Sequence, residues 1–212
     1  TVNLRLQAIN KYLEFIKQEK LKLKFVKVQQ RNFLENVISD ADYKFLKSKL
    51  KADGYDGWYF IVWFMAATGA RVSELQQIKV EHVLAGYLDM YTKGGKIRRL
   101  YIPKGLRVEA IKWIAEKQIQ SGYLFVNRFG ERLTTRGIAQ QLKHFAVKYN
   151  LNPKVVYPHS FRRRFAKNFL ERFNDIALLA DLMGHESIET TRIYLRRTAS
   201  EQQQIVDKIV NW

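Results

Sequence analysis

A run of ten apolar residues, WYFIVWFMAA at positions 58–67, constrains the fold of this 212-residue chain more than any other segment. A membrane-spanning helix needs roughly 20 such residues, so the run is about half the length of a span and fits a buried core helix. Thr68-Gly69-Ala70 interrupts the pattern, and Arg71 follows directly. We therefore expect a globular domain, with no membrane as partner, in which a buried helix ends beside a charged side chain.

The flanking segments predict a mainly α fold with a small antiparallel β-sheet (α+β). Apolar residues at steps of 3, 4 and 3 indicate a helix over residues 4–19. Ser39-Asp40-Ala41-Asp42 has the form of a capping box that starts another helix. Strand-like residues 86–91 and 97–102 flank Lys93-Gly94-Gly95-Lys96, which is a hairpin turn signal. Further helices are expected over residues 106–118, 134–149, 158–173, 174–183, 188–195 and 200–210, with a short strand over 123–126.

Net charge narrows the choice of partner. The chain has 37 Lys and Arg against 20 Asp and Glu, a formal net charge of +17. Such an excess indicates a polyanionic partner, and nucleic acid is the first candidate. A basic surface that only maintains solubility is the plainer alternative. The chain has no cysteine, which excludes disulfides and thiolate chemistry and is compatible with a reducing, intracellular setting.

Two motifs combine basic residues with chain turns. Glu74 stands three residues after Arg71, so a helix would place both on one face, where the carboxylate can hold the guanidinium for bidentate contact with a phosphate. A surface salt bridge is the alternative. The second motif is the hairpin, where a lysine at a glycine-rich turn can reach a reaction centre, although a solvated turn is the simpler interpretation. Residues 93–108 include no acidic side chain and six basic ones: Lys93, Lys96, Arg98, Arg99, Lys104 and Arg107.

Two further motifs contain histidine. His159 and Arg162 are one helical turn apart and share a face, which suits proton transfer combined with anion stabilisation. A basic helix that only contacts the DNA backbone is the alternative. Gly184 ends a helix just before His185, and Tyr194 follows nine residues later. A single tyrosine at a helix end is usually a packing residue.

The combination of these motifs points to phosphate chemistry. The chain shows no paired-carboxylate site, no Asp, Glu and His cluster with metal-ligand spacing, and no G-x-x-x-x-G-K-[ST] loop. We therefore expect no metal and no cofactor. Arginine and histidine would have to supply the positive charge, and a side chain the nucleophile.

Four stretches, in order along the chain, resemble the motifs of the tyrosine recombinases of the phage-integrase type. They are ATGARVSEL, TKGGKIRRLYIP, HSFRRRFA and LMGHESIETTRIY, and the likeness covers roughly residues 39–212. Arg163 stands where the family often has His, and Phe161 where it often has Leu. The resemblance implies double-stranded DNA as partner and a catalytic-domain fold of that family.

The resemblance also implies a role for each motif residue. Tyr194 would attack the scissile phosphodiester and form a 3′-phosphotyrosyl link, with His159 as general base. Arg71 and Arg162 would hold the non-bridging oxygens, and His185 would hydrogen-bond the phosphate. Lys93 would be the general acid, although Lys96 is close enough to compete for that role. Glu74 would orient Arg71, and further DNA contacts are expected from Lys96, Arg98, Arg99, Arg163 and Arg164.

Domain organisation follows the same likeness. Residues 1–20 resemble the last helix of a core-binding domain that is mostly absent here, residues 21–37 the basic linker, and residues 38–212 the catalytic domain. The apolar residues after Tyr194 resemble a C-terminal helix that docks on a neighbouring subunit of a DNA-bound tetramer; packing on its own domain is equally open. The implied setting is the prokaryotic cytoplasm, and the implied role the integration or excision of a mobile element.

Two other functions fit parts of the pattern. A type IB topoisomerase uses the same residue types but would relax supercoils without site preference, and the spacing from His185 to Tyr194 argues against it. A DNA-binding protein that retains only the fold is the non-enzymatic alternative. Every expected catalytic position is filled, which argues against such decay.

Overall fold

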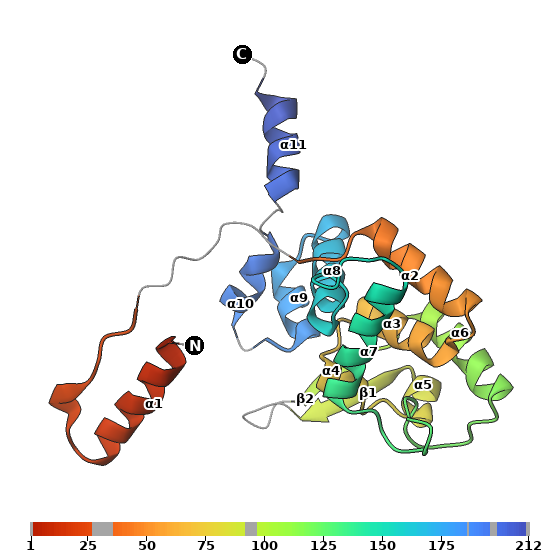
Figure 1. Ribbon diagram of the computed structural model, residues 1–212, viewed down its shortest axis with the longest axis horizontal. Coiled ribbons are helices and arrows are strands. Elements are labelled where there is room, and N and C mark those ends of the chain that lie inside the picture. The colour runs from red at the N-terminus through yellow and green to blue at the C-terminus, as the bar shows by residue number, and fades with distance from the viewer. Residues whose placement is uncertain (1, 27–35, 92–96, 186, 196–198, 211–212) are drawn as a thin grey trace. The chain divides into compact units, whose positions relative to one another are not determined.

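The computed structural model describes residues 2–26, 36–91, 97–185, 187–195 and 199–210. The chain divides into two compact units, Thr1–Asn32 and Phe33–Trp212. Helices make up most of the second unit, and a two-stranded antiparallel sheet completes it (Figure 1). The mainly α fold with a small antiparallel sheet is therefore confirmed. Among the described residues, no helix combines the length and the apolar character that a membrane crossing requires.

In the first unit, two asparagines of a helix hydrogen-bond the backbone of the segment that follows it. α1 (Val2–Phe15) is followed by a 3-10 turn, η1 (Glu19–Leu21). The Asn3 amide exchanges two hydrogen bonds of 2.9 Å with the backbone of Val26. The Asn10 amide does the same with the backbone of Leu23, at 2.8 and 2.9 Å. The two asparagines are about two helical turns apart and so lie on one side of α1.

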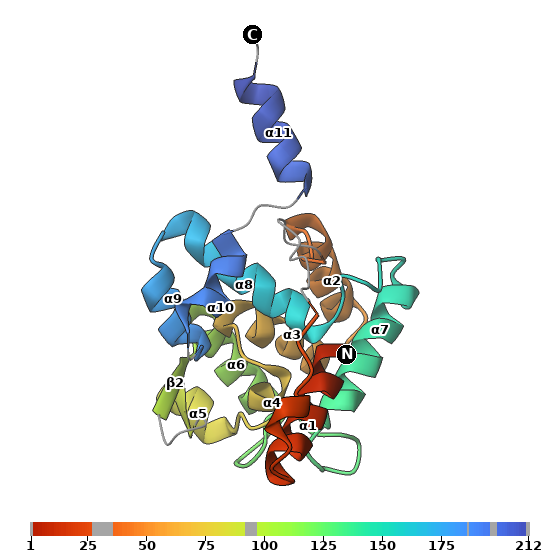
Figure 2. The same cartoon turned by 90° about the vertical axis from the view of Figure 1, so that its left-hand side faces the viewer.

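The second unit packs around α3 (Asp56–Thr68), the helix that contains the long apolar run. It lies against α2 (Asp40–Ala52), α6 (Lys104–Glu116) and α8 (Pro158–Arg172), which enclose it (Figure 2). The Ser39 hydroxyl accepts a hydrogen bond from the backbone N–H of Asp42 at 3.0 Å, which confirms the predicted cap of α2. The apolar run is thus a buried core helix, as expected.

The sheet is a single hairpin, and it brings one arginine to the interior. β1 (Tyr87–Tyr91) pairs antiparallel with β2 (Ile97–Tyr101), with Tyr87 opposite Tyr101. Alternate residues of both strands are buried, namely Leu88, Met90, Arg98 and Leu100. Both predicted strands are confirmed, while the predicted turn with Lys93 and Lys96 lies outside the described residues.

The remaining elements follow the expected order with two differences. They are α4 (Val72–Leu75), α5 (Val80–Ala85), α7 (Thr135–Lys148), α9 (Ile176–Met183), α10 (Ile188–Arg192), η2 (Ile193–Leu195) and α11 (Ala199–Ile209). Helix α5 was not predicted, since it is too short for its periodicity to be recognised. The strand predicted over residues 123–126 was wrong. It forms two isolated bridges, Lys79 with Tyr123 and Val126 with Arg132, because no neighbouring strand extends either pairing.

Replacing Phe64 by alanine tests the central position of α3. Phe64 is fully buried and packs edge to face on Phe125, with ring centroids 5.5 Å apart. We expect Phe64→Ala to lower the free energy of unfolding by about 3–5 kcal/mol, through lost burial and the cavity left behind. Phe129→Ala is the control, because Phe129 is exposed and its loss should cost about 0.5 kcal/mol or less. Equal losses in denaturant titrations would contradict this account of the core.

Candidate active site

Glu74 lies among three arginine side chains from three different elements. Its Oε1 accepts hydrogen bonds from Arg71 Nη1 at 2.8 Å and from Arg98 Nη1 at 2.5 Å. Its Oε2 accepts the backbone N–H of Arg71 at 2.7 Å and lies 4.0 Å from Arg162 Nη1. The predicted Arg71–Glu74 pair is therefore part of a larger cluster. One carboxylate shared by three guanidiniums leaves two positive charges in excess.

The Glu74 carboxylate and the Arg162 guanidinium are both charged at neutral pH. Burial by itself would raise the pKa of the Glu74 carboxyl, but the charge of Arg98 and hydrogen bonds from Arg71 and Arg98 hold it below its ordinary value. Burial, together with the charges of Arg71 and Arg98, lowers the pKa of Arg162 to about 10. That value is still well above neutral pH. The excess positive charge is therefore permanent under ordinary conditions.

The C-terminal ends of α3 and α9 supply most of the other partners of these arginines. A helix leaves its last carbonyls without helical partners and carries negative partial charge there, so a guanidinium is stabilised at such an end. The hydrogen bonds run from Arg71 to Gly184 O (2.9 Å), from Arg98 to Leu182 O (2.6 and 3.0 Å), and from Arg162 to Gly69 O (2.6 Å) and Met183 O (2.7 Å).

Glycine is required where each of these two helices ends. Gly69 and Gly184 both have left-handed backbone, with φ of 64° and 61°. A Cβ at Gly69 would collide with the Phe165 ring, and one at Gly184 with the Arg98 side chain. The two glycines therefore let the helix ends approach the arginine cluster closely.

His185 and Tyr194 lie beside Arg162. His185 follows the end of α9, and its Nε2 is 2.9 Å from Arg162 Nη2. Its ring stacks on the Tyr194 ring with centroids 6.2 Å apart and planes 13° apart. Tyr194 lies in η2 and is 9% exposed. The last two motifs of the sequence therefore meet in space at one arginine.

His159 is the exposed member of the group. It lies in the first turn of α8, one turn before Arg162. Loss of solvent and then the charges of Arg162, Arg163 and Arg71 lower its pKa, so the imidazole is neutral at pH 7. A neutral imidazole is the form that can accept a proton. Lys93 and Lys96, the two candidates for a general acid, lie outside the described residues.

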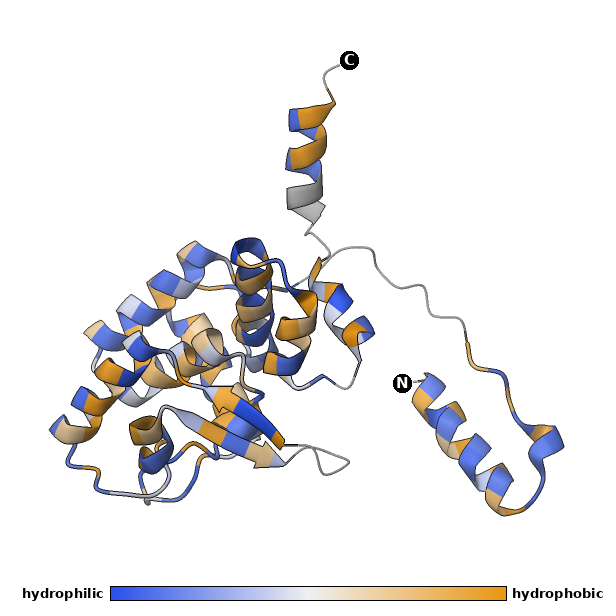
Figure 3. Ribbon diagram, turned by 180° about the vertical axis from the view of Figure 1, so that it is seen from behind, coloured by the Kyte–Doolittle hydropathy of each residue, from blue (hydrophilic) through white to orange (hydrophobic). Residues whose placement is uncertain are grey.

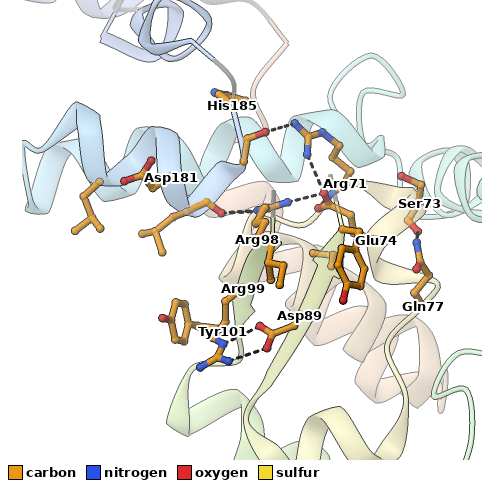
Figure 4. Close-up of a pocket in the computed structure, with 16 residues that line it drawn as sticks. Arg71, Ser73, Glu74, Gln77, Asp89, Arg98, Arg99, Tyr101, Asp181 and His185 are labelled. Atoms are coloured by element: carbon orange, nitrogen blue, oxygen red, sulfur yellow. Dashed lines mark hydrogen bonds and ion pairs between the residues drawn. The ribbon is translucent and has the colours of Figure 1, made fainter. Parts of the chain in front are cut away.

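An open pocket of about 1000 Å³ lies next to the cluster (Figure 4). Arg71, Glu74, Arg98 and His185 line it, together with residues of α9 and of both strands. Arg71 uses two of the five N–H groups of its guanidinium in hydrogen bonds to the described residues, which leaves others for a ligand in the pocket. In the described ranges, no three His, Cys, Asp or Glu side chains gather where they could hold a metal ion.

The structure revises the expectation for Arg98, which we predicted to contact DNA. Arg98 is 5% exposed, and its guanidinium is bound to Glu74 and to the end of α9. Strand alternation could have predicted its burial, because Arg98 stands two residues before the buried Leu100 and so shares its face.

Three of the other predicted DNA contacts lie among the described residues, and each has a protein partner. Arg99 forms a bidentate ion pair with Asp89, with both hydrogen bonds 2.7 Å long, and its guanidinium lies over the Tyr87 ring. Arg163 donates to the Tyr157 hydroxyl at 3.1 Å. Arg164 pairs with Asp40 at 2.7 Å. Sequence reasoning missed one more residue, the buried Thr191, whose hydroxyl lies 2.7 Å from His185 Nδ1.

Glu74→Gln tests the importance of the shared carboxylate. The amide keeps the shape of the side chain but removes the negative charge from between three guanidiniums. Removing one partner of a buried ion pair typically costs about 3–5 kcal/mol, and we expect a loss in that range in the free energy of unfolding. Asp89→Asn is the control, since its pair with Arg99 is exposed and should contribute about 1 kcal/mol or less. Equal stability of the two variants would contradict a central role of Glu74.

Comparison with known proteins places this geometry in a family. Residues 42–201 match the model of the phage integrase family. Tyrosine recombinase XerA of Pyrococcus furiosus is 32% identical over 213 residues, which cover 98% of this chain and 73% of the relative. The Pyrococcus horikoshii XerA is 30% identical over 220 residues, with the same coverage.

Solved structures show the same fold at lower sequence identity. The crystal structure of XerA recombinase superposes with a TM-score of 0.69 at 21% identity, over 99% of this chain and 76% of that one. The Tn1549 transposon integrase in complex with circular intermediate DNA gives a TM-score of 0.73 at 15% identity, over 99% and 80% of the two chains. With a family model that covers most of its length and relatives at 30% identity or more, this chain belongs to the phage integrase family, as a tyrosine recombinase.

Proposed function

We propose that the protein cleaves and rejoins DNA strands at a specific site through a covalent phosphotyrosyl intermediate on Tyr194. The observation that carries this proposal is the excess of two positive charges where Arg71, Arg98 and Arg162 share Glu74. A cluster of that charge beside a pocket favours an anion, and arginine suits phosphate because its planar donors match two oxygens at once. The Tyr194 ring stacks on the His185 ring, and His185 Nε2 lies 2.9 Å from Arg162 in the same cluster.

The proposed step forms one bond and breaks one. The Tyr194 oxygen attacks the phosphorus, the bond from phosphorus to the 5′-oxygen breaks, and a 3′-phosphotyrosyl link and a 5′-hydroxyl result. Phenols have ordinary pKa values near 10, so the attacking oxygen must lose its proton to a base. His159 is the proposed base, and Lys93 the proposed acid that protonates the leaving oxygen. The new link is itself a phosphodiester, so rejoining requires no ATP.

The arginines stabilise the five-coordinate phosphorus of the transition state. Arg71 and His185 line the pocket, and Arg162 contacts His185 through its Nη2. A phosphate that enters would compete with Gly184 O and Met183 O for these donors. Positive charge beside a phosphate is worth most where water is excluded, as it is around the buried Arg162.

Integration or excision of a mobile element is the proposed biological role. Its support is the likeness to phage integrases, together with a fold shared with a transposon integrase. A role in the resolution of chromosomes is the alternative. Mapping the cleaved sequence onto the source genome separates the two roles. A cleaved sequence at both ends of a mobile element would support integration or excision, and a single chromosomal copy that flanks no element would support the alternative.

A covalent-adduct assay tests the reaction. Duplexes with a random central segment are selected for binding, and the enriched sequence is remade with a nick that prevents rejoining. We expect wild-type protein to form an adduct that survives denaturation and carries the 3′-phosphate side of the break. Tyr194→Phe should form none. Tyr123→Phe, at a half-exposed tyrosine on the surface, should react like the wild type.

The other outcomes separate the alternative functions. An adduct that persists in Tyr194→Phe would contradict the choice of nucleophile. Adducts of equal yield on every sequence, with relaxation of supercoiled plasmid, would favour a topoisomerase of type IB. Tight binding without an adduct on any duplex would favour a non-catalytic DNA-binding protein.

We also propose that α11 docks on a second copy of the chain when the protein assembles as a tetramer on DNA. Val206, Ile209 and Val210 at this helix are 45–59% exposed, and the helix carries hydrophobic residues along its described turns (Figure 3). Such a stripe is typical of a helix that packs against a partner. Replacing Val206 and Ile209 by serine should leave DNA binding by single copies intact and reduce the mass of the DNA complex, measured by light scattering. An unchanged mass would contradict the proposal.

A further inference from the structure

The contact between Arg162 and His185 indicates which ring nitrogen of the imidazole carries a proton. Arg162 Nη2 lies 2.9 Å from His185 Nε2. A guanidinium has only N–H donors and no acceptor, so Nε2 must supply the lone pair. Burial, and then the charges of Arg162, Arg71 and Arg98, lower the pKa of His185 to about 4, so the ring is neutral at pH 7. A neutral imidazole with a bare Nε2 has its one proton on Nδ1.

The partner of that proton is the hydroxyl of Thr191. His185 Nδ1 lies 2.7 Å from Thr191 Oγ1, so Nδ1–H donates and the hydroxyl oxygen accepts. Thr191 is fully buried in α10, a helix that packs on α9. A buried ring N–H without an acceptor would be costly. The hydroxyl therefore holds the imidazole both in one tautomer and in one orientation.

Thr191 also stands at a fixed position relative to the proposed nucleophile. It precedes Tyr194 by three residues, about one turn of helix, so the two side chains lie on one face of α10 and η2. Both side chains contact the same imidazole, Thr191 through Nδ1 and Tyr194 through its ring face. One short segment thus sets the position of His185 relative to Tyr194.

We propose that Thr191 is a positioning residue, which holds His185 as the Nδ1–H tautomer with its Nε2 lone pair toward Arg162 until a phosphate enters the site. A hydroxyl can donate as well as accept. When Arg162 turns its N–H to a phosphate oxygen, one proton leaves Nδ1 and one binds Nε2 by exchange with water, with no change in charge. Thr191 then donates to the bare Nδ1, and Nε2–H faces the phosphate. This second half rests on the proposed function; the tautomer of the free protein does not.

Nitrogen NMR of the intact chain labelled with ¹⁵N-histidine tests the first half without DNA. The chain has four histidines, and the spectrum of His185→Gln identifies the signals of His185. We expect the shift of a protonated nitrogen at Nδ1 and of a bare nitrogen at Nε2. Thr191→Val has the same shape but no hydroxyl, so a buried Nδ1–H would have no acceptor. The ring should then give up its contact with Arg162, and this pattern should be lost. A bare Nδ1 in the wild type, or an unchanged pattern in Thr191→Val, would overturn the assignment.

Two further variants separate positioning from packing. Thr191→Ser restores the hydroxyl and should restore the tautomer pattern, even where loss of the methyl group lowers the melting temperature. Thr190→Val removes a hydroxyl at the adjacent, exposed position and should leave the His185 signals unchanged. If Thr191→Ser failed to restore the pattern, or if Thr190→Val removed it, the hydroxyl of Thr191 would not be the cause.

The rate of adduct formation tests the second half. Loss of one hydrogen bond to the positioned imidazole should slow adduct formation by about tenfold in Thr191→Val, and Thr191→Ser should recover most of that rate. An unchanged rate in Thr191→Val would overturn the role in the reaction. The expected tautomer in a wild-type protein that forms no adduct on any duplex would instead contradict the proposed function while the positioning of His185 stands.

Discussion

The shared carboxylate of Glu74 is the interaction on which the rest of the site depends. Three guanidiniums at this separation would repel one another in a weakly screened interior, and Glu74 is the acidic group that the structure places among them. The carboxylate neutralises one charge and leaves two. The cluster is therefore stable enough to fold and still positive enough to attract a phosphate. Arg98 contributes to that balance from the sheet, and Arg71 and Arg162 contribute from helical segments.

The helix ends around the cluster explain why the fold has its particular shape there. α3 and α9 both stop at a left-handed glycine, and both aim their last carbonyls at arginines. A side chain at either glycine would push the helix end away from the Phe165 ring or the Arg98 side chain. The carbonyls give the arginines hydrogen-bond partners that a phosphate can replace.

The sequence predicted the elements well where local patterns decide them, and the site less completely. The apolar run at 58–67, the Ser39 cap and the hairpin strands each follow from periodicity or capping, and the structure bears them out. The strand over residues 123–126 failed because pairing depends on a neighbour that no local pattern reveals. Arg98 was predicted to contact DNA, although strand alternation pointed inward. Thr191 left no signal in the sequence, because its contact with His185 exists only after α9 and α10 pack together.

A crystal structure of the protein grown with orthovanadate would show whether the arginine cluster binds phosphate, since vanadate mimics a five-coordinate phosphate. We expect vanadate between Arg71 and Arg162, with the Tyr194 oxygen as an axial ligand. Arg71 and Arg162 would have exchanged their bonds to Gly184 O and Met183 O for bonds to vanadate, while Glu74 stays bound to Arg98. Vanadate bound elsewhere, with both arginines still on those carbonyls, would contradict the claim that the charge excess around Glu74 is a phosphate site.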